Sequence, residues 1–136
     1  MKKALIIIVV LLVAIQFIPS NKTNPPVTAE IDAPTDVMAV FKRACYDCHS
    51  NETVWPWYSR IVPVSLLIED DVNEGRFHLN FSEWGDLSRK KKAKIKEEIW
   101  EMIEKGKMPL GKYIFMHPEA ELGARDKHII QNWSGE

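Results

Sequence analysis

The sequence is poor in cysteine, with two among 136 residues, and it lacks an excess of charge of either sign. Two cysteines are too few for a disulfide-stapled domain, so the thiols are expected to have a chemical role. A net charge of −1 argues against a nucleic-acid partner and a polybasic lipid surface. Period-2 alternation and internal repeats are also lacking, so we expect neither a sheet nor a repeat protein.

A long apolar run occurs once, from Ala4 to Ile18, directly after Lys2 and Lys3. It resembles the apolar region of a signal peptide or a short membrane anchor and predicts an exported protein. A helix of this length reaches about 22 Å, against about 30 Å for the hydrocarbon core, so an anchor would need snorkelling lysines or local thinning. No small-residue cleavage site follows. This favours an uncleaved helix in the inner membrane with the domain in the periplasm, and cleavage with release into the periplasm is the alternative.

The rest of the chain divides into a tether and one domain. Residues 1–18 form the signal anchor or signal peptide, and residues 19–34, rich in Pro, Asn, Thr and Ser, predict a flexible tether. Residues 35–136 predict one all-α domain. Its helices are expected from Thr35, as N-cap, to about Cys45, after Pro63 to about Gly75, between Ser88 and Gly106, and from Ala124 to Trp133.

Both cysteines fall in one motif, Cys45-x-x-Cys48-His49, which is the attachment pattern of a c-type haem. Two thiols about one helical turn apart can each form a thioether with a vinyl group of the porphyrin, and the adjacent imidazole then faces the iron. A domain of about a hundred residues can wrap this large apolar plate. The motif therefore predicts one covalent haem c per chain, with His49 as an axial ligand.

The motif has three other interpretations. A thioredoxin-like redox pair needs a strand-to-helix junction, which the sequence does not indicate. A plain disulfide between the two cysteines is a second alternative. A zinc site would add two histidines to the cysteines, at spacings unlike those of a compact finger, from among His49, His78, His117 and His128.

A second axial ligand is needed if the iron transfers electrons. Met108 is the leading candidate, because it follows Gly106 at a helix end and precedes Pro109, which stiffens the turn. His-Met ligation would raise the reduction potential relative to His-His ligation. The rival ligands are His78, Met116 and His117, whereas Met102 is expected in the core and His128 in a packing or surface position.

Aromatic and polar side chains are expected to surround the haem. Trp57 and Arg60 are candidate donors to its propionates. The second ring nitrogen of His49 is expected to bond a backbone carbonyl near Pro56 or Pro63. Further aromatic walls are expected from Trp55, Tyr58, Trp84, Trp100 and Trp133.

Two longer strings are more specific, "CYDCHSNETVWPWYSRIVPVSLLIEDDVNEGRFHLNFSEW" and "MPLGKYIFMHPEAEL". They resemble the bacterial haem-binding domain family of small exported c-type cytochromes, over about residues 37–133. The resemblance implies a cytochrome c-like helical fold, with haem on Cys45 and Cys48 and His49 as axial ligand. The chain departs from respiratory cytochromes in an acidic and aromatic insert from Glu69 to Trp84.

Together these features predict an exported monohaem cytochrome c that passes single electrons between membrane or periplasmic redox proteins. No enzyme activity is expected, because no set of nucleophile, base and orienting group is evident. The alternative is a haem-based sensor or peroxidase-like enzyme with an open or displaceable distal site. A zinc-stabilised interaction module is a third hypothesis.

Overall fold

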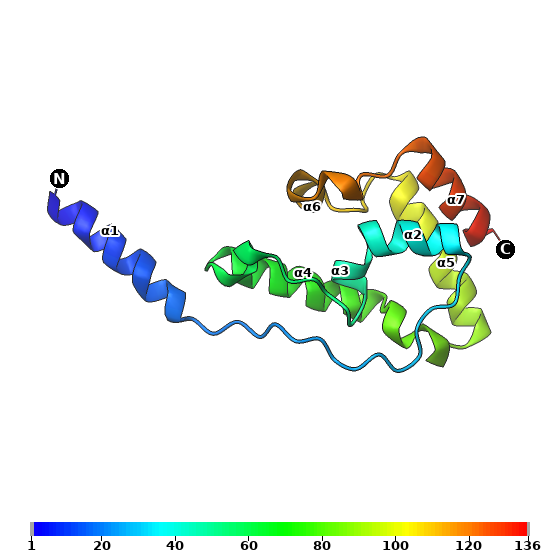
Figure 1. Ribbon diagram of the computed structural model, residues 1–136, viewed down its shortest axis with the longest axis horizontal. Helices are drawn as coiled ribbons and strands as arrows, with labels where there is room; N and C mark the ends of the chain where they lie inside the picture. The colour runs from blue at the N-terminus through cyan, green and yellow to red at the C-terminus, as the bar shows by residue number, and fades with distance from the viewer. Residues whose placement is uncertain (1, 136) are drawn as a thin grey trace.

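The computed structural model describes residues 2–135, and within them the chain is all-α, with seven α-helices and no strand (Figure 1). This confirms the predicted class. The helices are α1 (Lys2–Ala14), α2 (Thr35–Ala44), α3 (Tyr46–His49), α4 (Val64–His78), α5 (Arg89–Glu104), α6 (Gly111–Met116) and α7 (Ala124–Ser134). Short 3-10 turns lie between them: η1 (Ile15–Phe17), η2 (Trp57–Arg60), η3 (Phe81–Asp86) and η4 (Pro118–Ala120).

The core lies where α2, α5 and α7 pack together, with η3 beneath them. Phe41 is at its centre: its ring stacks on Phe81 at 4.7 Å and meets Trp133 edge-on at 5.2 Å. Such aromatic pairs add to the free energy of apolar burial. The buried apolar side chains of these three helices are Val37, Val40, Phe41, Ala44, Ile95, Ile103, Ile130 and Trp133.

The ends of α5 follow the sequence signals. The Ser88 side chain caps its start by accepting the Lys91 N–H at 3.3 Å. At its end Gly106 has a φ of 63°, which glycine adopts without strain, and the Lys107 N–H donates to the Met102 carbonyl at 2.9 Å. The predicted cap of α2 was wrong, because the helix already begins at Thr35 and its cap position is Pro34.

α4 is longer than predicted, because Gly75 does not end it and the helix continues to His78. A Cβ atom on Gly75 would lie 2.5 Å from the Cys48 carbonyl oxygen. Glycine is therefore required here by the close contact of α4 with α3 and not by a turn. The segment described above as an insert, Glu69–Trp84, forms most of α4 and η3.

α1 projects away from the domain (Figure 1) and buries none of its side chains. Within residues 2–135 no helix combines the length and apolarity needed to cross a membrane. The structure therefore does not support the predicted membrane-spanning helix: α1 has 13 residues, about 20 Å of helix, and ends before the tighter turn η1.

Residues 19–34 run along the domain as an extended strap that is bonded to it at several points. Arg76 of α4 donates to the Thr23 carbonyl at 2.8 Å, and the Ile31 N–H donates to the Phe81 carbonyl at 2.8 Å. Ile31 itself is buried in the core. The strap is thus part of the folded unit.

Candidate functional site

A cavity of about 720 Å³ lies between α3, α4, α5 and the loop that leads to α6. Its size is typical of sites for organic cofactors. Most of its interior is apolar, and the apolar lining includes Leu79, Phe81, Ile95, Ile99, Ile103 and Leu110. Charged side chains also contribute to the lining, namely Asp71, Glu74, Glu98, Glu101, Lys105, Lys107 and Lys112.

Cys45, Cys48 and His49 all line this cavity. α2 ends at Ala44, and the N–H groups of Cys48 and His49 donate to the Cys45 carbonyl at 3.2 and 2.9 Å. One turn of helix therefore presents both thiols and the imidazole on a single wall. The core supports this turn from behind, since Tyr46 is buried and stacks on Phe81 at 5.3 Å.

The orientation of His49 is fixed by two backbone carbonyls. Its Nδ1 lies 3.0 Å from the Gly75 oxygen and 3.1 Å from the Leu79 oxygen. Carbonyl oxygens only accept hydrogen bonds, so Nδ1 carries the proton and Nε2 keeps its lone pair. Burial lowers the pKa of His49, against the opposing effect of these hydrogen bonds, which favours the neutral imidazole that a metal ion requires.

The predicted partner of His49 was wrong, because the carbonyls come from α4 and its C-cap and not from the neighbourhood of Pro56 or Pro63. Residue type gives no signal for a backbone acceptor that lies 26 or 30 positions away. An isolated glycine inside a helical pattern, such as Gly75, is the one local feature that could have pointed to a close contact.

The two thiols are protonated at neutral pH. Burial raises the pKa of Cys45 to about 12 and that of Cys48 to about 11, with further contributions from Cys48 and Asp47 respectively. Both cysteines are free. A redox pair of the thioredoxin type needs a thiolate of lowered pKa, so these values count against that interpretation.

A zinc site is not formed by the described residues. Among residues 2–135, no group of three or more His, Cys, Asp or Glu side chains is placed to hold a metal ion. The zinc interpretation requires such a group around Cys45 and Cys48.

Three candidate second ligands line the same cavity. Met108 is half-buried there, in the loop after α5. Met102 of α5 also lines it, although the sequence suggested a core position, and so does the exposed His78 at the end of α4. The structure thus places all three side chains at the cavity.

The other candidate ligands lie elsewhere. His117 and Met116 line a second cavity of about 230 Å³ between η2, α4 and α6, and the Tyr58 hydroxyl lies 2.7 Å from His117 Nε2. His128 is exposed on α7, 3.2 Å from the Asn132 side-chain nitrogen.

Trp57 and Arg60 belong to η2, outside the large cavity, and both are exposed. In the described part of the chain no tryptophan lines that cavity. The tryptophans instead pack in the core, as Trp84 and Trp133 do, or lie at the surface.

α6 is held against the attachment motif. The Tyr113 hydroxyl donates to Asp47 Oδ2 at 2.8 Å, and Lys112 Nζ lies 2.8 Å from Asp71 Oδ1 of α4. Burial and the bond to Asp47 raise the pKa of Tyr113, so the phenol stays protonated and remains a donor. Asp47 lies between the two motif cysteines, and sequence reasoning missed it because its partner is 66 residues away.

The cavity suits the planar, largely apolar cofactor that the motif implies. Its volume, its apolar interior, the free Nε2 of His49 and the two thiols on the same wall are each what a covalently held haem requires. Fold and site together define a small helical domain that holds a C-x-x-C-H motif against a cofactor-sized cavity.

The chain belongs to the haem-binding domain family, whose model matches residues 10–136. No curated protein and no solved structure is significantly similar to it.

Proposed function

We propose that the protein is an exported c-type cytochrome that carries one haem, bound through thioethers to Cys45 and Cys48, and that it transfers single electrons. One observation carries this proposal. Both thiols and His49 line the same cavity, and backbone carbonyls bond His49 Nδ1, which leaves Nε2 free to bind iron. Haem supplies a one-electron couple, and the chain supplies its attachment, its iron ligand and an apolar enclosure.

Met108 is proposed as the second axial ligand. It lines the cavity on a loop whose start is fixed by the helix-ending turn at Gly106, and a thioether favours ferrous iron. If His49 and Met108 both held the iron, no coordination position would stay open for a substrate. That arrangement would suit electron transfer and is the reason we expect no enzyme activity.

The proposed location is the periplasm, at the outer face of the inner membrane. The apolar helix α1 is exposed on all sides, which favours export and attachment to the membrane. Redox proteins in the membrane or the periplasm are the proposed partners.

The experiment is expression of the full chain with a cytochrome c maturation system. The expected product is red, keeps its haem in denaturing gels and has the mass of the chain plus one haem. A colourless chain made beside a correctly matured control cytochrome would refute the proposal.

The ligand is tested with Met108→Ala, compared with Met116→Ala as a matched control outside the cavity. Met108→Ala is expected to change the spectrum from low-spin to high-spin and to open the iron to carbon monoxide. An unchanged low-spin spectrum would exclude Met108 and direct the test to His78 and Met102. Rapid carbon monoxide binding by the unmutated chain would instead favour the haem-sensor alternative.

A further inference from the structure

The turn η1, which directly follows α1, is bonded to the domain. Gln16 Nε2 donates to the Val62 carbonyl at 3.0 Å, and Gln16 Oε1 accepts the Val62 N–H at 3.0 Å. Just beyond, Lys22 Nζ donates to the Ser59 carbonyl at 2.7 Å and the Asn21 N–H donates to Glu69 at 2.9 Å. These bonds hold the residues that follow α1 directly against the segment from η2 to the start of α4, so α1 is not separated from the domain by a free linker.

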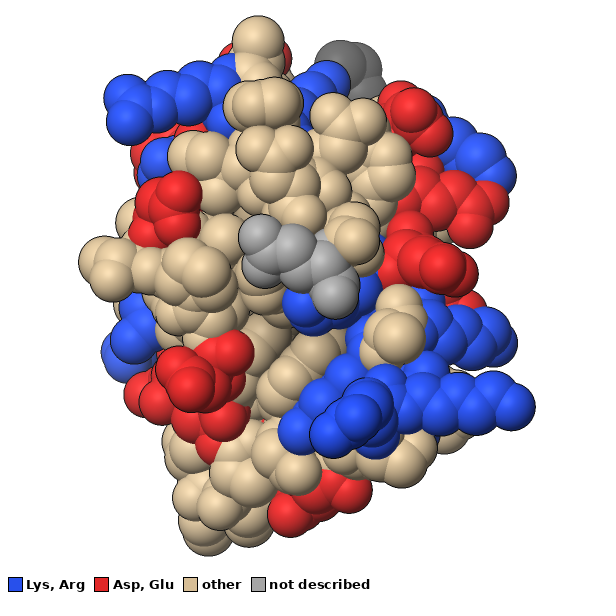
Figure 2. Space-filling model, turned by 90° about the vertical axis from the view of Figure 1, so that its right-hand side faces the viewer, with Lys and Arg blue, Asp and Glu red and all other residues tan. Residues whose placement is uncertain are grey.

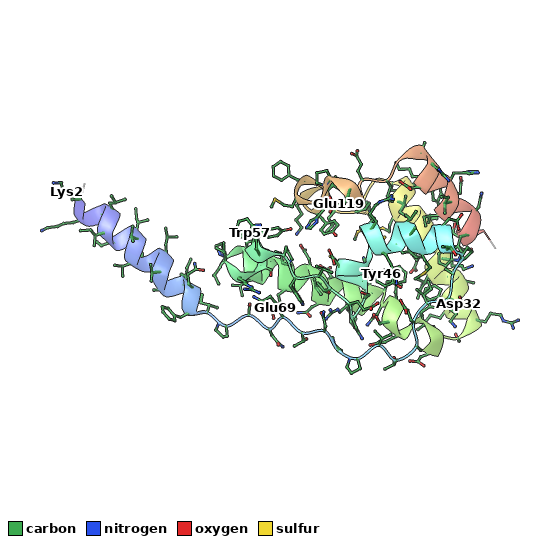
Figure 3. All side chains as sticks on the ribbon, viewed as in Figure 1. Lys2, Asp32, Tyr46, Trp57, Glu69 and Glu119 are labelled. Carbon is green, nitrogen blue, oxygen red and sulfur yellow. The ribbon has the colours of Figure 1, made fainter. Side chains whose placement is uncertain are left out.

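The domain surface beside this junction is apolar and exposed. We call it the proximal surface, and it consists of Trp57, Ile61, Val64 and Leu67. Trp57 is 73% exposed and Leu67 is 60% exposed, and Figure 3 shows Trp57 at the end of the domain nearest to α1. The connecting residue Phe17 is 83% exposed.

The opposite end of the molecule has a different character. Figure 2 shows basic and acidic side chains interspersed over that end. α5 also carries exposed ion pairs, such as Lys94 with Glu98 at 3.2 Å, as an ordinary solvated helix does. Among the described residues, none of the exposed large apolar side chains comes from α5 or α7, so the surface next to α1 differs from that end.

Lipid is the occupant that fits both α1 and the proximal surface. The side chains from Leu5 to Val13 are each more than half exposed, and a helix that is apolar on all sides is covered most simply by a lipid phase. Trp57 and its neighbour Arg60 are residue types that favour the headgroup region, where an indole or an aliphatic stem meets acyl chains and the polar group meets water or phosphate.

We infer that the proximal surface rests on the membrane surface, and that the bond pair between Gln16 and Val62 fixes the domain, with its haem cavity, at one orientation to the lipid. This rests on the proposed membrane location. A domain held in this way presents one fixed face to membrane-bound redox partners, whereas a domain on a flexible linker would first have to reorient.

The test uses the haem-loaded full chain in phosphatidylcholine–phosphatidylglycerol vesicles, with and without bromine on the acyl chains. Bromine quenches tryptophans that touch lipid, and haem quenching is the same in both vesicle types. Brominated lipid is expected to lower the tryptophan fluorescence of the unmutated chain. Trp57→Phe should lose at least half of that effect, and Trp84→Phe, at a buried tryptophan, should keep it.

A charge placed on the surface gives a second comparison. Ile61→Glu is expected to reduce the bromine effect at least twofold, whereas Phe77→Glu, at an exposed aromatic residue near the other end of α4, should leave it unchanged. Equal emission in both vesicle types, from a chain that sediments with them, would overturn the inference. Fluorescence that does not respond to bromine but changes with the number of chains per vesicle would indicate that a second copy covers this surface. That result would also overturn the inference.

The two proposals can fail separately. Haem content is read from the absorption spectrum of each sample, so a chain with correctly bound haem and no bromine effect refutes the lipid contact alone. A chain without haem that still shows the bromine effect refutes the cytochrome proposal alone.

Discussion

At the scale of single residues, Gly75 sets the distance between the two helices that present and orient His49. We expect Gly75→Ala to destabilise the protein by about 1–3 kcal/mol, because its Cβ would lie 2.5 Å from the Cys48 carbonyl oxygen and would force α4 away from α3. Urea unfolding checks this value. Gly111→Ala is the control, since nothing lies within 4 Å of its added Cβ. Equal stability of the two variants would mean that the helices yield without strain.

Residues at the site differ in how far the sequence could predict them. Cys45, Cys48 and His49 are adjacent in the chain, so their common wall follows from one turn of helix. Met108 could be placed near a helix end because Gly106, two residues earlier, is a typical helix-ending residue. The acceptors of His49 are backbone atoms brought close only by tertiary packing, and Trp57 and Arg60 suited haem chemically although the chain carries them to another surface.

At the scale of elements, helices with a one-sided apolar stripe and a clear end signal could be predicted. α5 and α7 are of this kind. α6 is different: it has six residues and buries none of them completely, and it is held by side-chain bonds to α3 and α4. Such an element depends on partners far away in the sequence, so local periodicity does not reveal it.

Tyr113 is the residue through which α6 is joined to the attachment motif. Tyr113→Phe should cost about 1.5 kcal/mol in urea unfolding, because the Asp47 carboxylate loses a hydrogen bond from a half-buried phenol. Lys112→Gln on the same helix, which breaks an exposed ion pair, should cost less than about 0.5 kcal/mol. If the two variants lose the same stability, Tyr113 has no special part in holding α6.

The raised pKa of Tyr113 also predicts a pH dependence. The unfolded phenol ionises near pH 10 while the folded one stays protonated, so its contribution is complete below about pH 10 and is lost as the pH rises through the higher folded value. Stability measured from pH 8 to 11 should therefore fall less steeply in Tyr113→Phe than in the unmutated chain. Parallel curves would contradict this assignment.

Arg76 holds the strap of residues 19–34 to the domain. Its guanidinium donates to the Ser50 and Thr23 carbonyls at 2.7 and 2.8 Å and to the Thr53 hydroxyl at 2.8 Å. Arg76→Lys should cost about 2 kcal/mol, because one ammonium group cannot span these acceptors. Trypsin should then cleave after Lys22 several-fold faster, as followed by mass spectrometry.

The control for this change is Arg125→Lys, at an exposed position on α7. Cleavage after Lys22 at the same rate in both variants would show that the strap is held by its other bonds.

At the scale of the whole molecule, one wall of the core faces the cavity, so the cofactor and the fold are expected to stabilise each other. Ile95 and Ile103 of α5 belong both to the buried core and to the cavity lining. A haem packed there would remove apolar surface from water on both partners, and a group held by the native state raises the free energy of unfolding.

We therefore expect the chain made without haem maturation to melt at least about 10 °C below the haem-loaded chain, which corresponds to about 2 kcal/mol or more for a domain of this size. Circular dichroism during heating of both forms measures the difference. Cys45→Ser/Cys48→Ser, matured in the same way, is the control for attachment, since it keeps the cavity and removes the thioethers. It should melt near the haem-free value after dialysis against a haem-binding protein. If all three chains melt together, α2, α5 and α7 form a complete core without the cofactor, and the cavity contributes nothing to folding.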